Sequence, residues 1–227
     1  MNEPESVKVV LLGESGVGKT SIISQFTTHK FNPRCPTSVS AQFISKTIDF
    51  PELGRAIKFD IWDTIGQEKY RSLAKIFYKD AKVIIFVYDI TTDYSFKGLK
   101  EYWFNETKDN SDTTPIYAVV ANKIDLYVEQ QVSNSDGQEF ADKIGAIFQT
   151  TSALSDSGIN TLFENIGKKY FMPDFDYKVD DQKAQEEFKK KLQVERDQNA
   201  KKKETKGVKL QKNNNNNDQN TRKKGCC

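Results

Sequence analysis

The chain has 227 residues and a formal net charge of +2, and its content of 37% hydrophobic and 29% charged residues predicts one globular domain with additional polar sequence. From Pro173 onward Lys and Arg outnumber Asp and Glu by 15 to 10, whereas before it the acidic residues lead by 22 to 19. A near-neutral globular part lacks the basic face that nucleic-acid binding requires, so we expect no nucleic-acid partner.

The three cysteines are Cys35 and the adjacent pair Cys226 and Cys227. They are too few for a disulfide framework, which favours a reducing compartment. The N-terminal residues are acidic where a signal peptide is basic, and no run approaches the roughly 20 apolar residues that span a bilayer. We therefore expect any membrane contact to be made by attachment.

Residues 1–172 alternate between two apolar patterns and predict an α/β domain. Short β-branched runs predict strands at 7–12, 57–62, 83–88, 116–121 and 146–150. Helical spacing is found at 19–28, 70–78, 94–109, 137–144 and 159–171. This order predicts a mostly parallel six-stranded sheet with helices on both faces. Residues 42–50 form a hairpin with the next strand, which adds one antiparallel strand.

The sequence from residue 173 to residue 227 differs in composition from the domain before it. Lys, Glu and Gln dominate it, and five consecutive asparagines precede its last ten residues, Asp218 to Cys227. Such a composition cannot bury a core, so we interpret 173–227 as a flexible tail.

Residues 13–20 read GESGVGKT, which is the phosphate-loop pattern of two glycines followed by Lys and Thr. The loop follows a predicted strand and opens a predicted helix, where backbone N–H groups converge on phosphate. Lys19 would neutralise the outer phosphates and the Thr20 hydroxyl would bind Mg²⁺. The predicted nucleotide contacts of this segment are Ser15, Gly16, Val17, Gly18, Lys19, Thr20 and Ser21. The alternative is an ordinary Gly-rich turn before a helix.

Two later segments predict that the base is guanine. Asn122-Lys123-Ile124-Asp125 follows a strand, and the Asp125 carboxylate can accept from both the ring N–H and the exocyclic amine of guanine. Asn122 and Lys123 would brace the loop and cover the ring. The backbone of Ser152, Ala153 and Leu154 would donate to the guanine carbonyl. As a lone tetrapeptide the first segment is also typical of a polar turn.

The segment WDTIGQE, residues 62–68, leaves a strand with an acidic residue followed by glycine. Asp63 could hold a metal-bound water, the Gly66 N–H could meet the terminal phosphate, and Gln67 could orient the attacking water as a catalytic residue together with Lys19. Each residue singly is also typical of a polar turn.

These motifs, in this order, resemble the small GTPases of the Ras superfamily and, within it, the Rab family, over residues 7–171. The phosphate loop, WDTIGQE, NKID and TSAL are shared across the superfamily, whereas EKYRSLA, FYKDA, VYDITTDYSF and the double-Cys end are typical of Rab chains. The resemblance implies that Phe31 stacks on guanine and that Phe43, Trp62 and Phe77 form an aromatic triad for effectors. The alternative for these aromatics is packing within the sheet.

Two departures from the family pattern concern the predicted switches. Family spacing puts Ser38, with Thr37 as the neighbouring alternative, in the place of a threonine that binds Mg²⁺, and Ser40 replaces a glycine. Ile65 replaces the alanine before Gly66, and its β-branched side chain restricts the backbone there. We therefore expect slow intrinsic hydrolysis. Because the sequence offers no obvious arginine finger, efficient turnover should need a GTPase-activating protein.

The terminal Cys226 and Cys227 follow a basic stretch and differ from the four-residue prenylation box. They resemble the Rab end that takes two geranylgeranyl groups, which would give stable anchoring where one chain is marginal. A metal-binding or accidental pair is the alternative. The resemblance implies an exchange factor, a dissociation inhibitor and a prenylation escort protein. It also implies a monomer on the cytoplasmic face of an intracellular membrane, with an escorted cytosolic pool.

The motifs therefore predict a GTP/GDP switch with Mg²⁺ that binds effectors in the GTP state, and the resemblance implies that this switch regulates vesicle traffic. The main alternative is a hydrolysis-deficient docking scaffold of the same fold. An ATPase or kinase with a phosphate loop is a further alternative, and it would show no preference for GTP.

Overall fold

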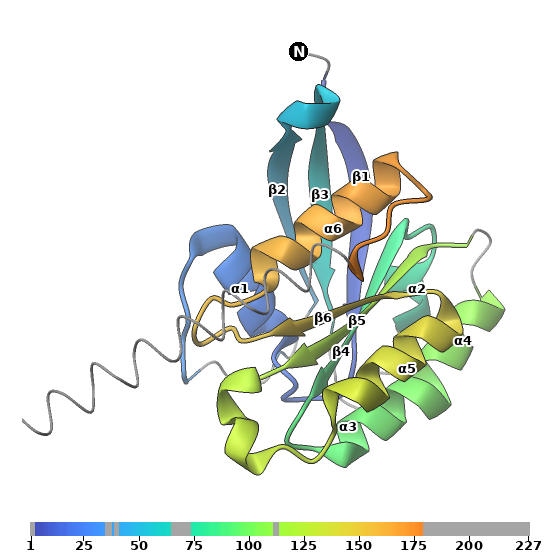
Figure 1. Cartoon of the computed structure of the whole chain (residues 1–227). Helices are drawn as coiled ribbons and strands as arrows, with labels where there is room; N and C mark the ends of the chain where they lie inside the picture. The colour runs from blue at the N-terminus through green and yellow to red at the C-terminus, as the bar shows by residue number, and fades with distance from the viewer. Residues whose placement is uncertain (1–2, 35–37, 39–40, 65–73, 111–113, 179–227) are drawn as a thin grey trace, which may run out of the picture. The chain divides into compact units, whose positions relative to one another are not determined.

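A computed structural model describes residues 3–34, 38, 41–64, 74–110 and 114–178. The strands are β1 (Glu5–Leu12), β2 (Gln42–Phe50), β3 (Arg55–Asp63), β4 (Val83–Asp89), β5 (Ile116–Asn122) and β6 (Ile147–Thr151). They form one sheet in the order β2-β3-β1-β4-β5-β6, in which β2 is antiparallel to β3 and every other neighbouring pair is parallel. The predicted six-stranded sheet is confirmed, and Figure 1 shows its arrangement.

The helices follow the predicted alternation with the strands. They are α1 (Lys19–Thr28), α2 (Ala74–Tyr78), α3 (Asp93–Gly98), the π-helical turn η3 (Leu99–Trp103), α4 (Phe104–Asn110), α5 (Asn134–Ile144) and α6 (Ile159–Phe171). The short 3₁₀ turns η1 (Pro51–Leu53) and η4 (Ile124–Glu129) complete the description. Residues 94–109, predicted as one helix, lie in α3, η3 and α4, because a π-helical turn interrupts the α-helical pattern.

One face of the sheet is covered by α1 and α6. Phe26 of α1 stacks on Phe163 of α6 with ring centroids 3.6 Å apart. Both rings form T-shaped pairs with Phe59, a residue of β3. Figure 1 shows α6 crossing this part of the sheet beside α1. These buried aromatic contacts fix the helix that carries the phosphate loop against the strands.

The opposite face is covered by α3, η3, α4 and α5. Phe86 of β4 lies opposite Leu12 of β1, whereas Phe59 lies opposite Val7. Leu12 and Val7 occupy even and odd positions of the same strand, so their side chains point to opposite faces. The Phe86 ring contacts Phe104 at the start of α4. The sheet is thus covered on both sides, as its nearly continuous apolar strands predict.

The start of α5 shows why sequence periodicity locates helix ends poorly. The apolar pattern predicts a start at Gly137, but the helix begins at Asn134. Ser133 accepts from the Asp136 N–H at 3.1 Å, and its own N–H donates to the Asp136 carboxylate at 3.3 Å. This capping box satisfies free N–H groups of the first turn, and therefore the helix starts before its first buried residue.

The described residues end at Lys178, beyond the predicted boundary at residue 172. Tyr177 is buried, and its hydroxyl donates to the carbonyl oxygen of Ala146 at 3.3 Å. The first compact unit extends to Lys178. Residues 179–227, including Cys226 and Cys227, lie outside the described residues, so the boundary and the tail stay predictions. In the part of the chain that is described, no helix is both long and apolar enough to cross a bilayer.

Candidate functional site

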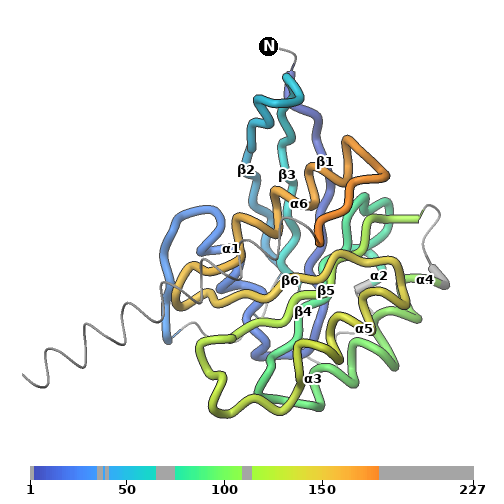
Figure 2. Tube along the Cα trace, in the orientation of Figure 1, coloured from blue at the N-terminus to red at the C-terminus, as the bar shows by residue number. Residues whose placement is uncertain are grey.

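The carboxyl ends of the parallel strands gather the predicted motifs at one edge of the sheet. The phosphate loop links β1 to α1, and the base-reading segments follow β5 and β6. Figure 2 shows the chain leaving β5 and β6 on the same side. Open α/β sheets bind ligands at this edge.

Glycine is required at both ends of the phosphate loop. Gly13 has φ +149°, and a Cβ there would lie 2.2 Å from the carbonyl oxygen of Val87 in β4. Gly18 has φ +101°, and a Cβ there would lie 2.3 Å from the amide nitrogen of Asn122. Backbone conformation and close approach therefore both exclude larger residues at these positions.

The Lys19 ammonium is buried at the centre of the loop. It donates to the carbonyl oxygens of Gly13 at 2.8 Å and Glu14 at 2.9 Å. Burial lowers the pKa of Lys19 to about 8, against the opposing effect of Asp63 and Glu14. A phosphate group would supply the negative charge that favours the ammonium. The other predicted loop residues differ in exposure: Val17 is buried, Gly18, Thr20 and Ser21 are half-buried, and Ser15 and Gly16 are exposed.

The three predicted metal ligands meet beside this loop. The Thr20 hydroxyl donates to Asp63 Oδ2 at 2.6 Å, and its oxygen lies 2.7 Å from the Ser38 hydroxyl oxygen. The three residues come from α1, from the segment between α1 and β2, and from the end of β3. Ser38 thus lies beside Thr20, and its role as a metal ligand stays a prediction.

These side chains fit a small hard cation. Asp63 is only 1% exposed, and no described residue hydrogen-bonds to its Oδ1 atom. Burial raises the pKa of Asp63, opposed by the bond from Thr20 and the charge of Lys19. Among the described residues no three His, Cys, Asp or Glu side chains gather into a metal cage. One carboxylate with hydroxyl groups suits Mg²⁺, which takes few protein ligands and completes its shell with water and phosphate.

Asn122 joins the base-reading segment to the phosphate loop. Its side-chain amide donates to the carbonyl oxygen of Val17 at 2.8 Å, and its Oδ1 accepts from the Thr151 hydroxyl at 3.0 Å. Lys123, at φ +67°, contacts Asp89 at the end of β4 at 2.6 Å. The Asn122 side chain therefore contacts the phosphate loop directly, and its role in nucleotide binding stays a prediction.

Asp125 is held by the other predicted guanine segment. The Ser152 hydroxyl donates to Asp125 Oδ1 at 2.5 Å, and Ser152 is also fixed by backbone hydrogen bonds with Ser157. Ala153 is buried and Leu154 is exposed. The structure thus brings together the carboxylate and the backbone segment that were predicted to recognise guanine.

The predicted aromatic triad is contiguous. Phe43 of β2 and Trp62 of β3 have ring centroids 5.2 Å apart, and Trp62 lies 5.9 Å from Phe77 of α2. Phe43 is 53% exposed, whereas Trp62 and Phe77 are half-buried. Phe31, predicted to stack on guanine, is half-buried and packs against the edge of the core.

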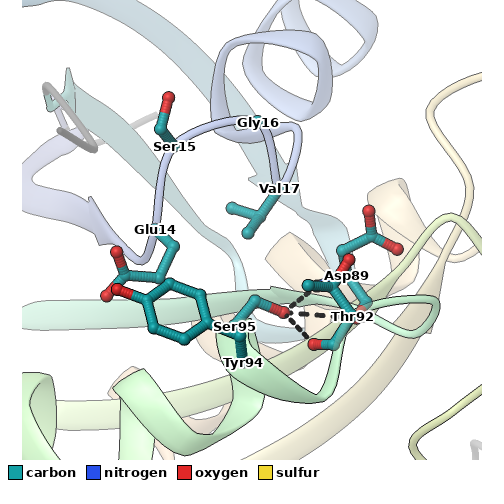
Figure 3. A pocket seen from close by; sticks show the side chains of 8 residues that line it. All are labelled: Glu14, Ser15, Gly16, Val17, Asp89, Thr92, Tyr94 and Ser95. Atoms are coloured by element: carbon teal, nitrogen blue, oxygen red, sulfur yellow. Dashed lines mark hydrogen bonds between the residues drawn. The ribbon is translucent and has the colours of Figure 1, made fainter.

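The structure adds residues that the motifs did not single out. A pocket of about 320 Å³ lies between the phosphate loop and the start of α3. Its lining residues are Glu14, Ser15, Gly16, Val17, Asp89, Thr92, Tyr94 and Ser95 (Figure 3). Asp89 also accepts from the Thr91 hydroxyl at 2.7 Å. Asp89 could have been predicted from the sequence, because it is an acidic residue at the carboxyl end of a buried strand.

Several predictions fall outside the described residues. They are Thr37 and Ser40 of the first predicted switch, Ile65, Gly66 and Gln67 of the second, and the terminal cysteines. Their roles stay predictions.

Comparison with known proteins agrees with this arrangement. The family model described as the Ras family matches residues 8–172. The chain is 39% identical to Ras-related protein Rab-22A of Homo sapiens over 163 residues, which are 72% of this chain and 82% of that protein. It is also 39% identical to Ras-related protein Rab-21 of Geodia cydonium over 162 residues, which are 71% and 69% of the two chains.

Proposed function

Because this chain belongs to the Ras family and, within it, to the Rab small GTPases of membrane trafficking, we propose that it is a switch that binds GTP or GDP with Mg²⁺ and hydrolyses GTP slowly. In this proposal the binding of effectors is the output, and slow hydrolysis limits its duration.

The observation that carries this proposal is the meeting of Thr20, Ser38 and Asp63 beside the phosphate loop. A bound Mg²⁺ would neutralise charge on the outer phosphates. Thr20 and Ser38 would hold it with hydroxyl oxygens, and Asp63 would act directly or through water. Because Ser38 lies between α1 and β2, its position would depend on whether the terminal phosphate is present.

Guanine recognition is supported by the fixed carboxylate of Asp125. With Ser152 donating to Oδ1, the carboxylate has remaining lone pairs that can accept from the guanine ring N–H and amine. Adenine would present an acceptor to the same carboxylate and leave buried polar groups unpaired. The backbone at Ala153 and Leu154 would donate to the guanine carbonyl, and Phe31 would cover the base.

Hydrolysis would follow in-line attack of water, with Gln67 orienting the water, Gly66 meeting the terminal phosphate and Lys19 neutralising developing charge. The bulk and β-branching of Ile65 make this step slow. Ile65→Ala should raise the single-turnover rate of GTP hydrolysis several-fold. Equal rates in the two chains would remove Ile65 as the cause.

The proposal includes partners of the family's general kind. Effectors would bind the aromatic surface formed by Phe43, Trp62 and Phe77, whose exposed part is apolar. An exchange factor and a GTPase-activating protein would set the nucleotide state. Geranylgeranyl groups on Cys226 and Cys227 would attach the chain to the cytoplasmic face of an intracellular membrane. A prenylation escort protein and a dissociation inhibitor would carry this lipidated monomer through the cytosol.

Phosphate release tests this function against the docking scaffold. The purified chain, loaded with GTP and Mg²⁺, should convert bound GTP to GDP over minutes to hours, and Gln67→Leu should abolish that conversion. GTP that stays intact on the wild-type chain would favour the scaffold.

Base recognition is tested separately by Asp125→Asn. This variant should shift preference toward xanthosine nucleotides, which carry a carbonyl where guanine has its amine. Asp49→Asn, an exposed substitution on β2, serves as the matched control and should keep the preference for guanine.

A further inference from the structure

Glu14 attaches the first half of the phosphate loop to the helical segment on the far side of the pocket. The Trp103 indole Nε1–H donates to Glu14 Oε1 at 3.2 Å, across 89 positions of sequence. Trp103 is fully buried and Glu14 is only 5% exposed. Figure 3 shows Glu14 and Ser15 leaving the loop in opposite directions. A charged group so buried is costly unless it is hydrogen-bonded.

The helical segment that contacts Glu14 has space for the carboxylate. A Cβ at Gly98 would lie 2.6 Å from Glu14 Oε1, so glycine leaves the space that the carboxylate fills. The next residues, Leu99–Trp103, form the π-helical turn η3, and the Phe104 N–H donates to the carbonyl oxygen of Leu99. A π-helical turn changes the direction of the side chains that follow it and is frequent at functional sites.

The same residue reaches the catalytic lysine through its backbone. The carbonyl oxygen of Glu14 accepts from the Lys19 ammonium at 2.9 Å. A shift of Glu14 would therefore move a group that holds Lys19 in place. The second half of the loop has its own support, since Asn122 donates to the carbonyl oxygen of Val17.

We propose that Trp103 is a positioning residue for nucleotide binding, which holds Glu14, and through it the first half of the phosphate loop, in the geometry that receives phosphate. The inference rests on the proposed function, because it assigns a role in the same nucleotide site. Trp103 does not touch the nucleotide. Its effect is to preorganise the loop, so its loss accelerates nucleotide release.

The experiment measures release of fluorescent GDP from the full-length chain in excess Mg²⁺. Trp103→Phe removes the N–H donor and keeps an aromatic ring, while Glu14→Met removes the acceptor from the loop side of the same hydrogen bond. Each should accelerate release about tenfold, because a buried hydrogen bond to a charged group is lost. Glu14→Gln keeps an acceptor oxygen and should release GDP within about twofold of wild type.

Tyr78→Phe is the matched control. The buried Tyr78 hydroxyl donates to Glu106 at 2.9 Å, so this substitution also removes a bond between an aromatic donor and a glutamate, and neither residue lines the pocket beside the phosphate loop. It should lower the midpoint of urea unfolding without changing the release rate. If Trp103 had only a structural role, Trp103→Phe would likewise lower the unfolding midpoint and leave the release rate unchanged.

The double variant Trp103→Phe with Glu14→Met decides whether the two residues act together. The inference predicts release no faster than in the more affected single variant, because both substitutions break one bond. Release from Trp103→Phe at the wild-type rate, or fully additive effects in the double variant, would overturn the inference and leave the proposed function standing. Failure of the wild-type chain to bind fluorescent GDP would overturn both.

Discussion

The side-chain amide of Asn122 donates to the carbonyl oxygen of Val17 at 2.8 Å and joins the end of β5 to the phosphate loop. Asn122 is almost fully buried and also accepts from Thr151 at the end of β6. One side chain therefore ties the loop that would hold phosphate to both segments that would read the base. Changes at Asn122 should affect affinity for the whole nucleotide.

Asn122→Asp tests this connection with little change in size. The substitution replaces the donor that faces Val17 with an acceptor, so two oxygens would face each other in a buried position. GDP affinity should fall about 30-fold in equilibrium titration, which corresponds to about 2 kcal/mol. Asn160→Asp, exposed near the start of α6, is the control and should bind as wild type. Unchanged affinity in Asn122→Asp would contradict the bracing role.

Gly18→Ala tests the packing at the start of α1. The added Cβ would combine a left-handed backbone with a close approach to the Asn122 amide. The free energy of unfolding should fall by about 3 kcal/mol in urea titrations, and GDP binding should be lost. Gly54→Ala is the control, because Gly54 has φ +60° with open space around its Cβ. Gly54→Ala should lower the free energy of unfolding by only about 1 kcal/mol. Equal losses for the two variants would argue against a close approach of the Gly18 Cβ to the Asn122 amide.

The pKa of Lys19 predicts a pH dependence of nucleotide affinity. In the nucleotide-free chain this pKa lies near 8, below the ordinary value of 10.5, because the ammonium is buried. Bound phosphate favours the ammonium, so binding takes up a proton once the pH exceeds about 8. GDP affinity should therefore fall about tenfold between pH 7 and pH 9. Lys19→Arg cannot lose its charge in this range and should flatten the profile.

The lowered pKa of Lys19 also determines whether stability rises or falls with pH. Between pH 8 and pH 10.5 the unfolded chain binds more protons at Lys19 than the folded chain does, so this residue makes the nucleotide-free chain more stable as pH rises. Urea unfolding of wild type and Lys19→Arg across this range measures the difference. If the contribution of Lys19 to the free energy of unfolding fell as the pH rises, burial could not be lowering the pKa of this residue.

Asp63→Asn tests the proposed magnesium site. Removal of the carboxylate charge weakens binding of a hard cation, so EDTA should accelerate GDP release much less in this variant than in wild type. Asp60→Asn on the same strand is the control, because Asp60 binds Ser45 instead of the site residues. An equal EDTA effect in wild type and Asp63→Asn would place the metal elsewhere.

Much of the fold follows from local patterns. The apolar runs around Val83 and Ile116 are long enough only for buried strands, and their alternation with helices determines a parallel sheet. The motif residues were found because each follows a strand, and parallel strands carry such residues to one edge. Asp125 and Ser152 were therefore assigned to one base from sequence, although only the structure shows the hydrogen bond between them.

The contacts between distant side chains were not predictable. Glu14 is a variable position inside the phosphate-loop pattern, and Trp103 reads as an ordinary apolar residue of a helix. Their hydrogen bond depends on the π-helical turn η3 and on the space at Gly98, neither of which has a periodic signal. The Asp89 contact with Lys123 likewise depends on the pairing of β4 with β5.

Competition between nucleotides tests the central claim most directly. Fluorescent GDP bound to the full-length chain with Mg²⁺ should be displaced by unlabelled GTP and GDP at micromolar concentrations or below, and ATP and ADP should fail to displace it even at millimolar concentrations. The discrimination rests on Asp125 accepting from guanine, whereas the acceptor nitrogen of adenine would face the same half-buried carboxylate without a hydrogen bond. Displacement by ATP at the same concentrations as GTP would contradict the assignment of this chain as a guanine-nucleotide switch.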